Sequence, residues 1–161
     1  MHRLAILTVA LFAVTLAACS HKATITTSNG TETLTTSGDN KTETITTKEG
    51  TVTVGQNAVD LSKLGVPIYP GSQQVSGLAG SGMRGSGQMV SLKTGDSFDK
   101  VFQWYKSQLP TGSQQMTSTT SGSSFAEFVI AAHGAAIMLS ERPNETDIVI
   151  TQSTTPAPAA T

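Results

Sequence analysis

The sequence has little cysteine, little charge and few aromatic side chains. Its 161 residues include 1 cysteine, which excludes an intrachain disulfide and any metal cluster built from several cysteines. Charged residues make up 13% of the chain and the formal net charge is −1, so charge gives no reason to expect nucleic acid or an anionic membrane surface as a partner. Aromatic residues make up 5%. This length and composition predict one domain with a modest core.

The N-terminus has the pattern of an export signal. Met1-His2-Arg3 is a basic start, and an apolar run follows from Leu4 to Leu16. This run is too short to cross about 30 Å of hydrocarbon as a helix rising 1.5 Å per residue. The small residues Ala17 and Ala18 come next, as they do before a signal cleavage site. The segment therefore predicts a signal peptide rather than a membrane-spanning helix.

The tetrapeptide Leu16-Ala17-Ala18-Cys19 resembles the lipobox of bacterial lipoproteins. The resemblance implies cleavage between Ala18 and Cys19, a diacylglycerol thioether on the cysteine, and acylation of the new amino terminus, with palmitate as an expected acyl group. Ser20 stands where an aspartate would resemble the inner-membrane retention signal, which favours an outer membrane location facing the periplasm. The alternative is an ordinary secretory signal followed by an unrelated cysteine. Several acyl chains together would anchor the protein essentially permanently.

Residues 23–55 form a threonine-rich segment with an uneven repeat. The unit Thr-Ile/Leu-Thr-Thr begins at Thr24, Thr33 and Thr44, and turn residues such as Ser28-Asn29-Gly30 separate the units. Threonine favours the extended conformation because its branched side chain fits a pleated surface. The pattern predicts four short strands, near residues 22–28, 31–37, 41–47 and 51–55.

These four strands carry few apolar residues, and a small sheet needs a hydrophobic face to be stable alone. Two interpretations of the segment stay open. It is a solvated spacer that lifts the next domain off the bilayer, or a β-meander whose thin apolar stripe docks on another surface. The apolar residues are Ile25, Leu34, Ile45, Val52 and Val54.

The following residues predict an amphipathic helix within a sheet-containing domain. Apolar side chains between Phe98 and Leu109 recur at i, i+3, i+4, i+7 and i+11, which places them on one helix face. Asp96 or Ser97 is the expected cap, and Pro110 ends the helix. Strands are expected near residues 73–79, 88–93, 113–119, 124–132, 135–140 and 146–152, with a flexible glycine-rich loop at 80–87.

The predicted fold class is α+β: a Thr-rich β-meander or stalk followed by a small antiparallel sheet packed on one amphipathic helix. The expected core residues are Phe128, Ile130, Ile137, Leu139, Ile148 and Ile150. The expected organisation is a signal peptide (1–18), a lipidated N-terminus (19–22), the Thr-rich β-repeat stalk (23–55), a small α+β domain (56–152) and a disordered tail (153–161).

Residues 44–110 resemble a group of bacterial lipoproteins with no established activity. The resemblance implies a compact α+β domain tethered to a membrane, and it carries over no catalytic residues. The matching motifs follow a polar β-repeat and are Pro67-Ile68-Tyr69-Pro70-Gly71, Thr94-Gly95-Asp96-Ser97, Trp104-Tyr105 and Leu109-Pro110.

Two further motifs resemble catalytic or cofactor-binding sequences but lie in the wrong context. Residues 80–85 match GxGxxG, yet a strand is expected after them, whereas the dinucleotide motif must open a helix. Lys93-Thr94-Gly95 and Ser97-Phe98-Asp99-Lys100 look like two elements of the penicillin-recognising serine enzymes. Here the two elements are nearly contiguous and in reversed order, so they predict no catalytic site.

The sequence therefore predicts a non-enzymatic envelope lipoprotein, attached to the bilayer through acylated Cys19. Arg84 and Trp104 are the candidate contacts with another envelope protein, and no cofactor, metal or nucleic acid is expected. One alternative is a periplasmic ligand-binding lipoprotein, in which the glycine-rich loop closes over a cleft beside the helix. Another is a hydrolase that would use Ser97, Ser124 and His133, which show no recognisable arrangement in the sequence.

Overall fold

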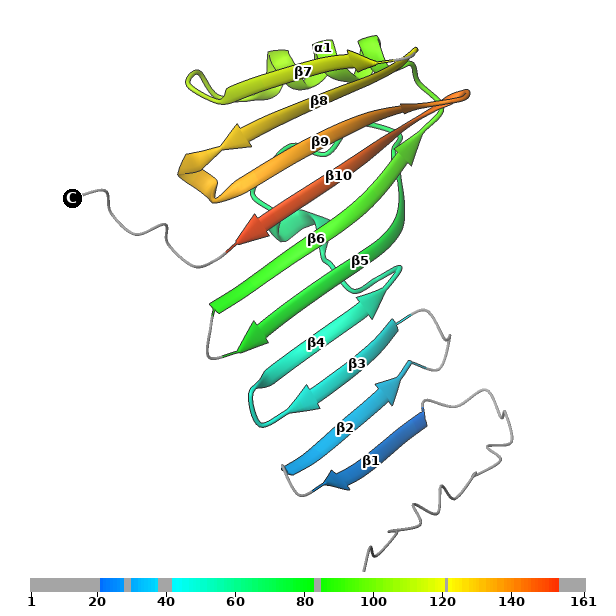
Figure 1. Ribbon diagram of the computed structural model, residues 1–161, viewed down its shortest axis with the longest axis vertical. Helices are drawn as coiled ribbons and strands as arrows, with labels where there is room; N and C mark the ends of the chain where they lie inside the picture. The colour runs from blue at the N-terminus through cyan, green and yellow to red at the C-terminus, as the bar shows by residue number, and fades with distance from the viewer. Residues whose placement is uncertain (1–20, 28–29, 38–41, 83–84, 121, 154–161) are drawn as a thin grey trace, which may run out of the picture.

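The computed structural model describes residues 21–27, 30–37, 42–82, 85–120 and 122–153. Over these ranges the chain forms one antiparallel sheet of ten strands, one α-helix and two short 3-10 helices. Figure 1 shows the strands stacked along the long axis of the molecule, with β1 at one end and α1 at the other.

The strand order follows the chain from β1 to β6 and then runs backwards from β10 to β7. After β6 the chain passes through α1 to the far edge of the sheet, enters β7, and returns strand by strand until β10 pairs with β6. The strands are β1 (His21–Thr27), β2 (Gly30–Thr36), β3 (Thr42–Thr47), β4 (Gly50–Gly55), β5 (Gln73–Gly82), β6 (Gly85–Thr94), β7 (Gln114–Thr120), β8 (Ser123–Ile130), β9 (Ala135–Arg142) and β10 (Glu145–Ser153). The helices are η1 (Leu61–Lys63), α1 (Phe98–Gln108) and η2 (Ala131–His133).

Eight of the strands confirm the predicted positions. The strands predicted in the threonine-rich segment match β1–β4 to within one residue, and the last four match β7–β10 to within two. Local chemistry explains the agreement. The turn between β3 and β4 is closed by the Glu49 N–H, which donates to Thr47 Oγ1 over 3.1 Å. At the β9–β10 turn, Asn144 takes a positive φ of 64°, which asparagine tolerates better than most residues.

The expected glycine-rich loop at 80–87 is wrong. β5 runs to Gly82 and β6 starts at Gly85, so most of this segment is a β-hairpin. Its glycines permit close approach rather than flexibility. A Cβ at Gly82 would overlap the Glu49 carbonyl oxygen, and one at Gly50 would overlap the Ser81 carbonyl oxygen. The absence of side chains at these two positions lets the start of β4 pair with the end of β5.

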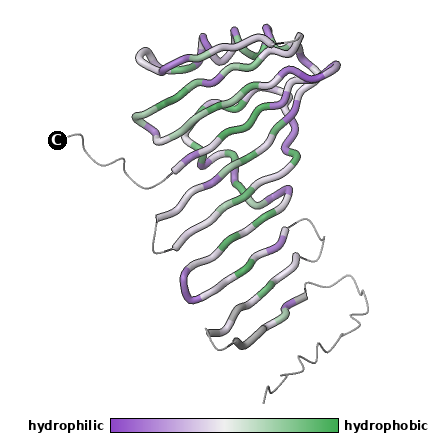
Figure 2. Tube along the Cα trace, viewed as in Figure 1, coloured by the Kyte–Doolittle hydropathy of each residue, from purple (hydrophilic) through white to green (hydrophobic). Residues whose placement is uncertain are grey.

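The hydrophobic core lies on one face of the sheet at the α1 end, where α1 and the segment from Val59 to Tyr69 cover β6, β10, β9 and β8. The six predicted core residues are all buried, which confirms that prediction. Figure 2 shows the hydrophobic stretches concentrated in this half, while β1–β4 are mostly pale with isolated hydrophobic positions. The strand residues of the core are Val90, Leu92, Ala126, Phe128, Ile130, Ala135, Ile137, Leu139, Ile148 and Ile150.

The predicted fold class, a small sheet packed on one helix after a separate meander or stalk, is wrong. The chain is mostly strand, and β4 pairs with β5 over six residue pairs, so the threonine-rich strands continue the sheet that carries the core. The apolar pattern of each strand is local information, but which strand edges meet is not. Strands with little apolar surface gain stability by extending an existing sheet, because each new pairing satisfies the backbone groups of a free edge.

Candidate interaction surface

The two faces of the sheet differ sharply in the threonine-rich half. One face continues the side that carries α1, and we call it the covered face; the opposite side is the open face. On the covered face, cross-strand register lines up threonines from β2, β3 and β4. Thr44 and Thr53 lie with their hydroxyl oxygens 3.2 Å apart, and those of Thr46 and Thr51 lie 3.4 Å apart. This part of the covered face is a hydroxyl-lined surface.

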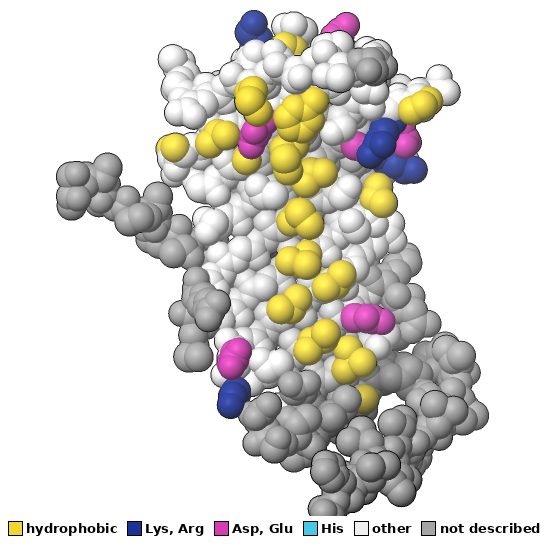
Figure 3. Space-filling model, viewed as in Figure 1, with side chains coloured by type: hydrophobic (Ala, Val, Ile, Leu, Met, Phe, Trp, Pro, Cys, Tyr) yellow, Lys and Arg dark blue, Asp and Glu magenta, His cyan; other side chains and the backbone are white. Residues whose placement is uncertain are grey.

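The open face carries a continuous row of apolar side chains across the strands, which we call the apolar stripe. The register places Leu34 beside Ile45 and Ile45 beside Val52. Further along, Val54 lies beside Leu78, which lies beside Met89. Figure 3 shows this column of hydrophobic side chains running along the long axis of the molecule. The stripe consists of Leu34, Ile45, Val52, Val54, Leu78, Met89, Val149 and Met138.

The stripe is accessible to solvent over most of its length. Its five large side chains in β3, β4, β5 and β6 are each between 38% and 44% exposed, whereas residues of the core are 9% exposed or less. Single exposed apolar residues are common on protein surfaces, but a contiguous row of them is typical of an interaction site. No segment among the described residues covers this row, so the predicted docking of the stripe does not occur within the described part of the chain.

Four charged residues of the open face lie at one end of the β9–β10 hairpin, next to the end of β6, and form two ion pairs. Arg142 Nε lies 2.9 Å from Asp147 Oδ2, and Lys93 Nζ lies 3.9 Å from Glu145 Oε2. These exposed pairs contribute little stability. The stripe itself consists of uncharged apolar residues, and its charged cross-strand neighbours are two carboxylates, Glu43 beside Val54 and Glu127 beside Met138.

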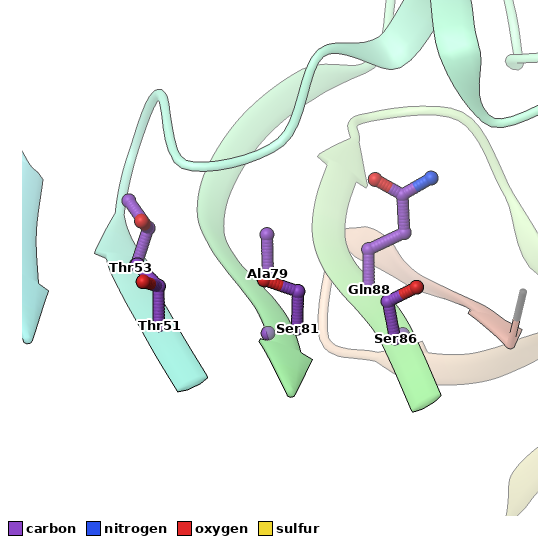
Figure 4. A pocket seen from close by; sticks show the side chains of 8 residues that line it. Thr51, Thr53, Ala79, Ser81, Ser86 and Gln88 are labelled. Carbon is purple, nitrogen blue, oxygen red and sulfur yellow. The ribbon is translucent and has the colours of Figure 1, made fainter. Parts of the chain in front are cut away.

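A shallow hollow of about 270 Å³ lies on the covered face, beyond the residues that cover the core. Figure 4 shows Thr51, Thr53, Ala79, Ser81 and Gln88 around it, on β4, β5 and β6. Gln88 Nε2 donates to Gln152 Oε1 over 2.7 Å, which fixes one wall. None of the residues that line the hollow is charged or titratable at neutral pH. The hollow therefore offers hydrogen bonds but no acid, base or activated nucleophile.

Trp104, a predicted contact residue, is half-buried in an aromatic cluster rather than free on the surface. Its ring lies edge-on to Tyr69 at 5.2 Å and to Tyr105 at 4.9 Å between centroids. Edge-on packing of this kind stabilises aromatic pairs beyond the area they bury. Trp104 therefore helps to fix α1 against the Val59–Tyr69 segment, and only its outer part can meet a partner.

Asp96 links Tyr69 of the same cluster to Lys100 of α1, and of the two residues predicted as the helix cap it is Ser97 that occupies the N-cap position. Ser97 is the residue before the helix, and its side chain makes no capping hydrogen bond. Asp96 instead accepts from Lys100 Nζ at 2.7 Å and from Tyr69 Oη at 2.7 Å. These two hydrogen bonds hold the pKa of the Asp96 carboxyl below its usual value. For Tyr69, burial and the bond to Asp96 raise the pKa of the phenol.

The remaining predicted site residues are either outside the described part of the chain or not brought together. Ala18, Cys19 and Arg84 lie outside the described residues. Ser124 stands near the start of β8, and His133 follows its end in η2. At about 3.3 Å per residue the strand between them separates these two side chains by roughly 20 Å. The hydrolase arrangement is therefore not assembled by Ser124 and His133.

Sequence reasoning missed the half of the stripe that lies beyond the threonine repeat. Leu78, Met89, Val149 and Met138 alternate with core or small residues along their strands, as Met89 does with Val90. The sequence shows these residues as a second set of apolar positions on strands whose other face packs in the core. This second set was missed because a strand that is apolar on both faces is usually read as fully buried.

Neither a membrane-spanning helix nor a metal site is found in the part of the chain that the structure describes. No helix there has the length and apolarity needed to cross a bilayer. No group of three or more His, Cys, Asp or Glu side chains in the described ranges is placed to hold a metal ion. Comparison with protein-family models, with curated proteins and with solved structures finds no match to this chain.

Proposed function

We propose that the chain is a lipid-anchored envelope lipoprotein that acts as a non-enzymatic interaction or structural module. The lipobox-like sequence that ends in Cys19 supports the anchor. The observation that carries the structural role is that β1 starts at His21, two positions after this cysteine, and belongs to the same sheet as the core. An anchor at Cys19 would therefore attach to the sheet itself with almost no linker.

The strand order gives this module a defined reach. Neighbouring strands lie about 4.8 Å apart, so β6 is about 24 Å from β1 and β7 is about 43 Å from β1. Backbone hydrogen bonds connect every neighbouring pair along this direction. The threonine-rich strands would thus act as a stiff spacer, which holds the helix-covered end at a fixed height above the lipid surface and presents the open face alongside it.

The ligand-binding alternative has weaker support. The glycine-rich segment that was expected to close over a cleft is a β-hairpin. The hollow on the covered face is shallow, and its lining has no charged group that would select a ligand.

Metabolic labelling with an alkyne-bearing fatty acid tests the anchor. The full-length chain is expected to take up the label and to fractionate with membranes, and the Cys19→Ser variant is expected to do neither. A Ser20→Ala variant is the matched control, because it alters the neighbouring residue and leaves the thiol in place. Labelling that persists in Cys19→Ser, or its absence from the parent chain, would refute the anchor.

A second experiment tests the module. Photo-crosslinking residues at positions 104 and 133, together with position 78 on the open face, report neighbours of the protein in intact envelopes. The proposed role predicts protein crosslinks from position 78 that are lost in Cys19→Ser. Equal crosslinking from all three positions would argue against a defined interaction face.

A further inference from the structure

We propose that a second copy of this chain packs on the open face, with apolar stripe against apolar stripe and the two β1 strands at the same end. The evidence for the pairing is the exposed apolar face of the sheet, and it does not depend on the proposed function. The parallel orientation rests on the proposed function, because two copies anchored through Cys19 in one membrane must point the same way.

The open face is the side of the sheet that no second layer of structure covers. α1 and the segment from Val59 to Tyr69 lie on the covered face, so they leave the open face without a second layer. Sheets with an apolar face ordinarily bury it against another layer. Ile45, Val52 and Val54 remain more than 40% exposed although they form one row with Leu78 and Met89. A second layer must come from outside the described part of this chain.

The size of the stripe fits a second copy. Its five most exposed side chains, each between 38% and 44% exposed, belong to one contiguous apolar patch, and contiguous patches of this kind typically mark interaction sites. A stable interface buries about 800 Å² on each copy, so the contact would have to include the flanking threonine, serine and glycine positions of β3–β6. A small ligand would cover only part of a row that crosses seven strands of the sheet, from β2 to β9.

The shape of the stripe also fits a two-fold pairing. The row steps along the strands by two residues within β4 and again between β6 and β10, and so runs along the long axis of the molecule (Figure 3). Rotation by half a turn about that axis brings each residue opposite its own equivalent or that residue's neighbours. Gly80 and Gly87 lie side by side within the row and leave a flat surface between the larger side chains. Two sheets pack in this way about 10 Å apart, with side chains interleaved.

Two carboxylates on the open face limit the extent of the proposed contact, and one of them ends it at β9. Glu43 lies beside Val54 at the rim, near the start of β3, where it stays in water. Glu127 is half-buried on the open face between Met138 and Met116. Burying an unpaired carboxylate is unfavourable, so the proposed interface stops at β9 and leaves β8 and β7 outside.

Crosslinking of single-cysteine positions in membranes tests the pairing. The substitution Leu78→Cys puts a thiol near the middle of the stripe, and Ile45→Cys puts one towards its β1 end. Because packed sheets lie farther apart than a disulfide can span, the probe is a short bis-maleimide rather than an oxidant. The controls are Ser81→Cys on the covered face of β5 and the parent chain, whose only cysteine is Cys19.

The expected result is covalent dimer from Leu78→Cys and from Ile45→Cys, at least tenfold above Ser81→Cys and the parent. Dimer from Leu78→Cys without Ile45→Cys would keep the pairing and overturn the parallel orientation. No dimer from Leu78→Cys would overturn the pairing, whether the stripe is then bare or is covered by lipid or another protein. Dimer from the parent chain would show a free Cys19 thiol, which counts against the proposed anchor and not against the pairing.

A charge placed in the stripe gives an independent test. In the Leu78→Cys chain, Val52→Lys is expected to reduce crosslinking at least tenfold, because two lysines would meet in an apolar interface. Thr53→Lys, the next residue on β4 but on the covered face, is the matched control and is expected to leave crosslinking unchanged. Both positions are accessible enough to accept lysine, and equal thermal unfolding of the two variants would verify this. Equal crosslinking from both would overturn the pairing.

Discussion

The hydroxyl of Tyr105 predicts a substitution that stabilises the protein. Tyr105 is fully buried on the inner face of α1, and its hydroxyl has no hydrogen-bond partner among the described residues. A buried polar group without a partner destabilises a protein by about 1–3 kcal/mol. Tyr105→Phe removes the hydroxyl and keeps the ring, whose contacts with Trp104 and Phe128 are apolar. We expect the free energy of unfolding to rise by about 1 kcal/mol, after allowance for the small void.

The same chemical change at Tyr69 is the control and has the opposite sign. The Tyr69 hydroxyl donates to Asp96 over 2.7 Å, so Tyr69→Phe removes a bond to a charged acceptor and is expected to lower stability. Urea unfolding followed by circular dichroism measures the free energy of unfolding of both variants. In thermal unfolding, the Tm of Tyr105→Phe should rise by about 4 °C. If Tyr105→Phe is destabilised as Tyr69→Phe is, the Tyr105 hydroxyl has a hydrogen-bond partner and the reasoning is refuted.

Alkaline pH gives a second measurement on the same residue. Burial raises the pKa of the Tyr105 phenol far above its ordinary value of 10.0, and the nearby Tyr69 backbone lowers this pKa only in part. The two groups are not placed to form a hydrogen bond of good geometry. Above pH 10 the unfolded chain therefore loses a proton that the folded chain keeps, and stability falls as the pH rises. Tyr69, whose pKa is also raised, contributes to the same fall. Tyr105→Phe should make the decline shallower, and an unchanged slope would contradict the assigned burial.

Three further predictions follow from the fold and its buried contacts. Ile137→Ala should lower the free energy of unfolding by about 3 kcal/mol in urea titrations, because Ile137 is fully buried, while Ile45→Ala, at an exposed position, should change it by less than about 1 kcal/mol. Gly134→Ala should lower it by about 1–2 kcal/mol, because Gly134 has a φ of 58° and a Cβ there would lie 2.7 Å from the Ser153 carbonyl oxygen. The pKa of Asp96 is depressed in the folded state, so its stabilising effect should be present above pH 3.8 and should be lost as the pH falls below that value. Asp96→Asn should flatten the acid limb of a stability–pH curve, and an identical limb would contradict this role.

The strands and the helix were predictable because their signals are local. Threonine-rich alternation and turn residues specify β1–β4, and the spacing from Phe98 to Leu109 specifies the buried face of α1. The core residues of β8–β10 were predictable for the same reason, since Ile137 and Leu139 alternate with less apolar neighbours on one strand. In each case the information lies within about ten residues of the chain.

The features that escaped prediction depend on contacts between distant residues. Nothing near Val54 shows that it will lie beside Leu78, so the joining of the threonine-rich strands to the core sheet was missed. Asp96 stands one residue before the N-cap residue Ser97, and its carboxylate bonds to the Tyr69 hydroxyl, 27 residues earlier in the chain, a contact that the local sequence does not show. Gly82 was interpreted as flexible because the approach of Glu49 is visible only in three dimensions.

The stacking of strands along one axis has a mechanical consequence. In an antiparallel sheet the backbone hydrogen bonds run perpendicular to the strands, so here they lie along the line that joins the β1 edge to the α1 end. A force that pulls on the chain at His21 opens the bonds between β1 and β2 one pair at a time, starting at His21 and Thr36, instead of shearing all of them together. β1 to β4 would unzip in sequence before the core is disturbed. A tether at this end would therefore lengthen under tension while the α1 end stays folded.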